Sequence, residues 1–198
     1  MRDMRMAHRE FFWERHSAGD GSWRKASGAP AGGDLAALRR GIGKEAGSVP
    51  EMWPFYTTLT ADGRLTAALR AEHVALTLYA VHQQSLAQPA HRSGVGLGSA
   101  MRTLRDSDKF SAEALDRRFT AAATATSLAE LSVHLRGLVT QLRAIRPGPG
   151  LDYSWLFRDL RDWQWPDRVS AVRRRWGSQY FVRHAESSSP GLPYSPAA

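Results

Sequence analysis

The sequence predicts an all-α protein, a helical bundle of about eight or nine helices in which an N-terminal helical lobe packs on a C-terminal bundle. Apolar residues recur at intervals of three and four along most of the chain, as in amphipathic helices. No segment sustains the period-two alternation of a half-buried strand. A length of 198 residues, with 42% hydrophobic and 23% charged residues, is typical of a globular protein.

The first half of the chain carries four expected helices. The first is a short amphipathic stretch over residues 4–16, followed by a loop rich in Gly, Ser and Ala. Asp34 is expected to cap a helix over residues 35–42, which ends among glycines. Pro50 begins a short third helix. Residues 65–84 are apolar on nearly every helical face, which predicts a central, buried helix.

The second half begins, after a polar loop, with a short helix over residues 98–106, and Ser111 is expected to cap the next one. The clearest periodicity follows, in six apolar residues at spacings of 3, 4, 3, 4 and 3, which we call the leucine seam. Its members are Leu128, Leu131, Leu135, Leu138, Leu142 and Ile145. A Pro-Gly-Pro-Gly segment stops this helix, and Asp152 caps another. Pro166 begins the last helix, which is expected to end near residue 182.

The expected division of the chain is a helical lobe over residues 1–95, a helical bundle over residues 96–185 and a disordered Ser/Pro-rich tail over residues 186–198. No run approaches the roughly 20 apolar residues of a membrane span. The first 16 residues lack the apolar segment and cleavage site of a secretory signal. We therefore expect a soluble, cytoplasmic protein with no membrane partner.

Enzymatic and cofactor chemistry finds no support in the sequence. The absence of cysteine excludes disulfides, thiolate zinc sites, iron–sulfur clusters and thiol catalysis. No histidine pair has the spacing of a helical zinc site, and no serine lies in a nucleophile elbow. The Gly-rich segment over residues 94–98 follows a loop rather than a strand, so it does not match a nucleotide-binding fingerprint. We expect no metal, no cofactor and no catalytic residue.

The formal net charge is +8, and only Lys25, Lys44 and Lys109 among the 27 basic residues are lysines. Arginine pairs with phosphate through a planar fork of donors, so this composition favours a polyanionic partner. A GC-rich coding bias, which raises the Arg and Ala content together, is the alternative explanation.

Several arginines fall on stripes beside the apolar faces of the expected helices. If these helices lie side by side, the stripes can form one basic face that follows a phosphate backbone without reading base sequence. The alternative is a set of ordinary solvated helix faces with some arginines paired to acids. The candidate nucleic-acid-binding residues are Arg39, Arg40, Arg102, Arg105, Arg117, Arg118, Arg136 and Arg143.

The chain also carries a set of motifs in a fixed order. They are Leu38-Arg39-Arg40, Val49-Pro50-x-x-Trp53, Gly96-Leu97-Gly98-x-Ala100-Met101, Arg117-Arg118-Phe119, His134-Leu135-Arg136-x-Leu138-Val139, Leu151-Asp152-Tyr153-x-x-Leu156-x-x-Asp159-Leu160, Trp163, and the segment from Val172 to Trp176. In order and spacing they resemble the CasB family, the small subunit of the type I-E CRISPR Cascade surveillance complex. The resemblance covers about residues 33–181. The loop over residues 26–33 and the C-terminal tail depart from it.

The resemblance implies a non-catalytic, all-helical protein present in two copies per complex. Its implied partners are the backbone and large subunits of Cascade, a second copy of itself, the guide RNA (crRNA) and the target DNA. By resemblance, Arg40, Arg117, Arg118 and Arg136 match basic positions of the family, and the other four candidates rest on helix geometry. The implied role is to hold the guide–target hybrid and the displaced strand of the R-loop in antiviral defence. The alternative function is a free-standing helical protein that binds nucleic acid nonspecifically.

Overall fold

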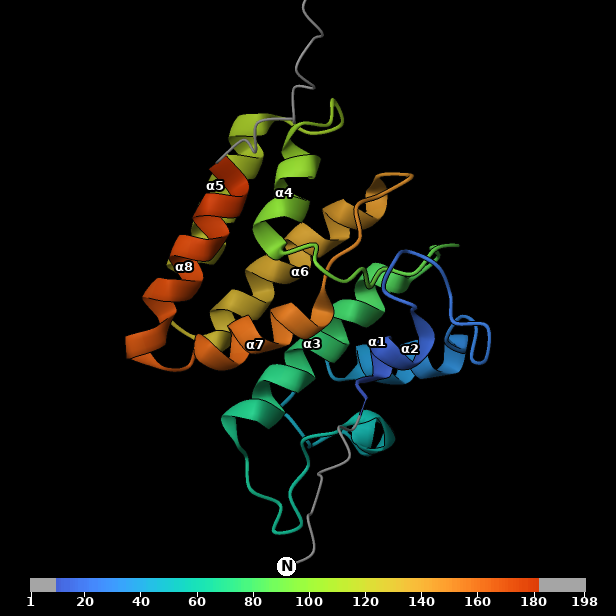
Figure 1. Ribbon diagram of the computed structural model, residues 1–198. Helices are drawn as coiled ribbons and strands as arrows, with labels where there is room; N and C mark the ends of the chain where they lie inside the picture. The colour runs from blue at the N-terminus through green and yellow to red at the C-terminus, as the bar shows by residue number, and fades with distance from the viewer. Residues whose placement is uncertain (1–9, 182–198) are drawn as a thin grey trace, which may run out of the picture.

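The computed structural model describes residues 10–181, and this part of the chain is all-α, as predicted (Figure 1). In chain order its helices are α1 (Phe12–His16), α2 (Gly32–Arg40), the 3₁₀-helix η1 (Pro50–Phe55), α3 (Ala67–Gln83), α4 (Leu97–Arg105), α5 (Ala112–Thr124), α6 (Leu128–Ala144), α7 (Tyr153–Asp162) and α8 (Pro166–Phe181). Within residues 10–181 no strand forms, and β-pairing is limited to two isolated bridges, Ser17 with Trp23 and His91 with Leu151.

Helix α3 lies in the middle of the molecule, where it packs against α2, α6 and α7 (Figure 1). Every residue from Ala71 to Gln83 is buried, which confirms the predicted central helix. The buried set includes the carboxylate of Glu72, which accepts hydrogen bonds from the backbone N–H and hydroxyl groups of Thr57 and Thr58 at 2.6–2.9 Å. These four bonds compensate for the cost of removing the carboxylate from water.

Helices α4, α5 and α8 gather at the other end of the molecule from α1 and α2 (Figure 1). Helix α6 packs against both α3 and α5. The four inner members of the leucine seam are buried, while its ends, Leu128 and Ile145, are partly buried against the same core. The side chains of Ser111 and Asp152 accept hydrogen bonds from Ala114 N and Trp155 N, so both predicted caps are confirmed.

Helices α4 and α8 cross closely at Gly98. A Cβ atom added at this position would lie 2.3 Å from the carbonyl oxygen of Trp176, which is shorter than any ordinary non-bonded contact. The ring of Trp176 stacks on Trp163, with 5.1 Å between ring centroids. The absence of a side chain at Gly98 thus allows α4 to reach the aromatic face of α8.

Two expected helices differ from those observed near the N-terminus. The first was expected over residues 4–16, but α1 begins at Phe12, because the Glu14 carboxylate accepts the backbone N–H of Phe11 and closes the helix start there. Residues 4–9 lie outside the described part of the chain. Helix α2 was expected to begin after a cap at Asp34, but it begins at Gly32. The carbonyl of Ala31 already accepts a helical hydrogen bond from Leu35 N, so Asp34 lies in the first turn.

Helix α4 is displaced by one residue from its expected bounds of 98–106, because its hydrogen-bonding pattern begins with Gly96 as the N-cap. The predicted tail over residues 186–198 lies outside the described residues. The division at residue 95 stays a prediction, and the described core runs through both halves. Among the helices from α1 to α8, none has the length and apolar character needed to cross a membrane.

Candidate nucleic-acid interface

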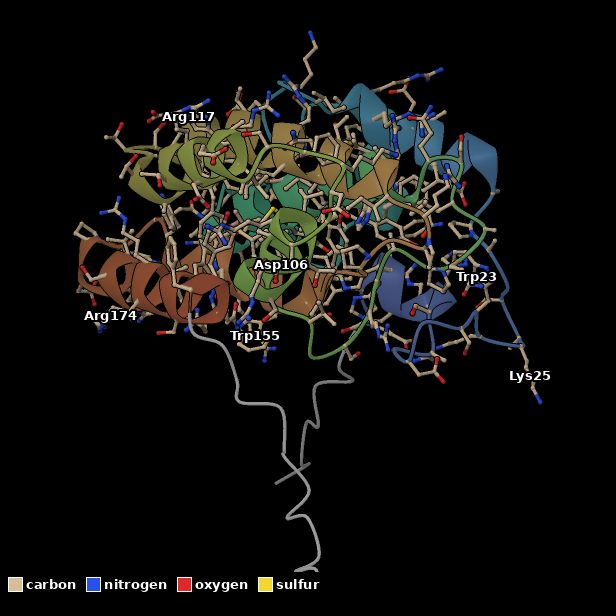
Figure 2. The ribbon with its side chains drawn as sticks, turned by 90° about the horizontal axis from the view of Figure 1, so that it is seen from above. Trp23, Lys25, Asp106, Arg117, Trp155 and Arg174 are labelled. Atoms are coloured by element: carbon tan, nitrogen blue, oxygen red, sulfur yellow. The ribbon has the colours of Figure 1, made fainter. Side chains whose placement is uncertain are left out.

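Helices α5 and α6 pack against each other and carry four of the eight predicted arginines. On α5 the buried face consists of Leu115, Phe119 and Ala122, so Arg117 and Arg118 project into solvent. Within residues 10–181 neither guanidinium forms an ion pair or a hydrogen bond. Figure 2 shows Arg117 at the margin of the molecule, on the outer side of α5. These two side chains are therefore exposed positive charges, and the charge of Arg117 adds to the hydrogen bond from Ser111 in lowering the pKa of Glu113, one turn earlier on α5.

Helix α6 holds its two predicted arginines in different environments. Arg136 is partly buried and has no acidic partner in the described chain. The Nη1 atom of Arg143 donates to Gln84 Oε1 at 2.8 Å and to the carbonyl of Val81 at 3.4 Å. The last carbonyls of a helix lack intrahelical partners, so Arg143 acts as a C-terminal cap of α3. Its guanidinium is thus already engaged in holding α6 to α3.

The two arginines of α4 are both paired with acids. Arg105 binds Asp116 of α5 through two hydrogen bonds, at 2.8 and 3.3 Å, and Tyr180 of α8 donates to the same carboxylate at 2.6 Å. The hydrogen bond from Arg105 is the main reason why the pKa of Asp116 lies below its usual value. Arg102 contacts Asp106 on its own helix at 3.5 Å. Arg105 therefore joins α4 to α5 and α8, whereas the pair of Arg102 with Asp106 is local to the end of α4.

Arg39 and Arg40 occupy the last turn of α2, at the opposite end of the molecule from α5 in both views (Figures 1 and 2). Arg40 forms an exposed ion pair with Glu51 at 2.6 Å, while Arg39 is partly buried and has no carboxylate partner among residues 10–181. The eight predicted residues thus do not form one continuous stripe. Arg117 and Arg118 are adjacent on α5, Arg136 lies at a groove lined by residues 41–46, and Arg143 is held against α3.

A cation outside the predicted set is exposed on α8. Of the arginines there, Arg173 donates to the carbonyl of Ala125, Arg175 binds the buried Asp159, and Arg168 pairs with Asp162. Arg174 is exposed and has no such partner in the described chain, and Figure 2 shows it at the same end of the molecule as Arg117, on the lower edge where Arg117 is on the upper one. The run of arginines in the sequence signals this cluster, but the sequence does not distinguish the unpaired member.

Two further cations, Lys44 and Arg70, lie beside Arg136 at a groove between α3 and α6. They were not predicted, since Arg70 is one charged residue in an apolar helix and Lys44 lies in a loop. No three His, Asp or Glu side chains within residues 10–181 come together as a metal site requires. The buried histidines serve the fold instead, as where Nδ1 of His91 accepts the backbone N–H of Tyr153 at 3.2 Å.

The fold and its sequence resemble known proteins. The family model of the CRISPR-associated protein Cse2 matches residues 34–181. The crystal structure of CasB from Thermobifida fusca is 34% identical, with a TM-score of 0.62, and the match covers 76% of this chain and 85% of that chain. CasB from Thermus thermophilus is 26% identical with a TM-score of 0.57, over 75% of this chain and 85% of that chain. A chain of a CRISPR RNA-guided surveillance complex is 25% identical with a TM-score of 0.54, over 77% of this chain and 82% of that chain.

Curated proteins compared by sequence gave no match. The Cse2 and CasB matches cover most of the chain and agree with the family that the ordered motifs resemble, so that resemblance and its non-catalytic expectation are confirmed. The chain therefore belongs to the Cse2 (CasB) family of CRISPR-associated proteins.

Proposed function

We propose that this chain is the small subunit of a cytoplasmic type I-E CRISPR Cascade surveillance complex, where it holds the backbone of guide RNA and target DNA and stabilises the displaced strand. The observation that carries the proposal is the pair Arg117 and Arg118, which is exposed on a helix of the Cse2 fold and forms no ion pair or side-chain hydrogen bond within residues 10–181. Its partners in this role are the backbone and large subunits and a second copy of itself. A solved structure with the same fold is a chain of a CRISPR RNA-guided surveillance complex.

In guide-directed recognition the protein need contribute only charge and shape, and it need not read the base sequence. Base pairing supplies the sequence specificity, and opening the DNA duplex against the guide is a nearly balanced exchange. A few phosphate contacts on the displaced strand are then enough to shift the equilibrium. The subunit itself needs only weak affinity, because the effective concentration of the strand inside an assembled complex is high.

The direct test reverses the charge of the α5 pair in the assembled complex. The double variant Arg117→Glu/Arg118→Glu should assemble normally but bind target DNA more weakly, and the weakening should shrink as salt rises. The slope of log K against log salt is negative, and each lost single-strand phosphate contact makes it shallower by about 0.7. The double variant should therefore make the slope shallower by about 1.4. Electrophoretic binding assays at several salt concentrations measure this slope.

The matched control is Lys25→Glu/Arg64→Glu, which changes the net charge by the same amount on two exposed loops outside α5 and removes only the local, exposed ion pair of Arg64 with Asp62. It should leave the salt slope unchanged. Equal DNA affinity for the α5 variant and the wild type at moderate salt would refute the proposed contact. Salt-sensitive binding of DNA by the isolated chain, with the same affinity as the whole complex, would instead favour the free-standing nucleic-acid-binding protein.

A further inference from the structure

A groove of about 350 Å³ opens between α3, α6 and the segment over residues 41–46. Its walls are mostly apolar, with Ile42, Val74, Leu78 and Val81 among the lining side chains. Val133 of α6 lies at the groove and is 56% exposed, so it extends the apolar lining to the surface. The groove is therefore an apolar surface that the described part of the chain leaves uncovered.

The polar groups in the floor of the groove already have partners within the chain. His73 Nε2 lies 2.9 Å from the carbonyl of Gly41, and its Nδ1 lies 2.6 Å from the hydroxyl of Tyr56. The hydroxyl of Thr77 donates to the carbonyl of Val74 at 2.9 Å. An occupant would thus meet apolar surface rather than free donors or acceptors. This favours an aliphatic or aromatic side chain over a nucleic-acid base, whose edge groups would lose their hydrogen bonds to water.

The rim of the groove is positively charged. Lys44, Arg70 and Arg136 all line it, against the one acidic lining residue Glu45. None of the three cations forms an ion pair or side-chain hydrogen bond within residues 10–181. Three unpaired cations around an apolar depression complement a ligand that carries carboxylates next to an apolar group.

We propose that this groove receives a segment of another protein subunit, in which one large apolar side chain is flanked by acidic residues. The apolar side chain fills the depression beside Val133, and the carboxylates face Lys44, Arg70 and Arg136. The inference rests on the proposed function, since it presumes that the chain works within an assembly. It assigns to this groove a role in attachment, separate from the contact between α5 and nucleic acid.

The test measures incorporation of variant subunits into the complex assembled from the remaining Cascade subunits and guide RNA, by size-exclusion chromatography and titration. Val133→Asp, which places an acid inside the groove, should weaken incorporation about tenfold or more. Its matched control is Ala171→Asp, at an exposed position on α8, which should incorporate like the wild type. Lys44→Glu/Arg70→Glu should weaken incorporation similarly, and both residues are exposed and unpaired, so folding is preserved.

The outcomes separate this proposal from the proposed function. The Lys25→Glu/Arg64→Glu control carries the same charge change as the rim variant and should incorporate normally. Arg117→Glu/Arg118→Glu should also incorporate normally while losing DNA affinity. Wild-type incorporation of both groove variants would overturn the proposal. Normal incorporation combined with a loss of target-DNA binding by the rim variant would overturn it too, and would assign the groove to nucleic acid.

Discussion

At the scale of single residues, the interior of this fold holds several ionisable side chains in their neutral form. His82 of α3 is buried, with Nδ1 3.1 Å from the hydroxyl of Tyr153. Burial, assisted by the positive charge of Arg143, lowers the pKa of His82 from 6.5 to about 3. Burial also lowers the pKa values of His73 and His91. The unfolded chain therefore takes up protons at these sites at a pH where the folded chain does not.

We expect the stability of the protein to fall as the pH drops below 6.5, since the unfolded state binds protons first. For His82 alone the loss in the free energy of unfolding between pH 6.5 and pH 5 is about 2 kcal/mol. Urea unfolding of His82→Gln at pH 7 and pH 5 should show a difference smaller than that of the wild type by this amount. His134→Gln, on the half-exposed side of α6, is the control. An unchanged difference in His82→Gln would contradict the assignment.

The sequence predicts single residues well where the determinant is local. Ser111 and Asp152 cap their helices because the side chain and the N–H it accepts are three residues apart. Whether an arginine forms an ion pair depends instead on acids that are distant in the sequence. Arg105 finds Asp116 on another helix, and Arg40 finds Glu51 across a loop, so the sequence could not separate these from Arg117. This is why the site was predictable as a set of candidates but not as a surface.

At the scale of elements, the close crossing of α4 and α8 depends on a glycine. Gly98 lies against the backbone of Trp176, while Gly137 in the middle of α6 has no atom within 4 Å of an added Cβ. The sequence shows both as glycines in or near helices, and only the packing distinguishes them. The same limit applies to helix starts, because α2 begins at a backbone carbonyl where the sequence points to Asp34.

Gly98→Ala should lower the free energy of unfolding by about 2 kcal/mol or more, because the backbone of α8 must move to admit the methyl group. Gly137→Ala should raise it by about 0.5–1 kcal/mol, since alanine favours the helix and meets no neighbour. Urea denaturation followed by circular dichroism measures both. Equal effects of the two substitutions would show that Gly98 lies farther from the backbone of α8 than the structure indicates.

At the scale of the whole molecule, α3 connects the two halves of the chain. It packs against α2 from the first half and against α6 and α7 from the second. The sequence predicted the burial of this helix from its apolar faces, and it predicted the all-α class from its period. It could not predict which helices cover α3, because many arrangements bury the same faces. The prediction of two lobes can be tested by measuring whether the protein unfolds in one cooperative transition or in two.

We expect one cooperative unfolding transition, because neither half can keep its apolar surface covered once α3 is released. Circular dichroism at 222 nm, the usual measure of helix content, and tryptophan fluorescence should give the same denaturation midpoint. Tryptophan fluorescence samples both halves of the chain, since Trp13 lies beside Tyr153 and Trp176 lies beside Trp163. Two separate transitions would show that the lobes unfold independently.

Trp13 bears on how the chain reaches this structure in the cell. Its indole N–H donates to Ser154 Oγ at 2.8 Å, and its ring is fully buried against Tyr79 and Tyr153. The ribosome makes Trp13 early and Ser154 about 140 residues later. At a synthesis rate of about 5–20 residues per second, the aromatic side chains of α1 wait roughly 7 to 30 seconds for α7. During that interval Trp13 lacks both the hydrogen-bond acceptor and the aromatic partner that α7 supplies.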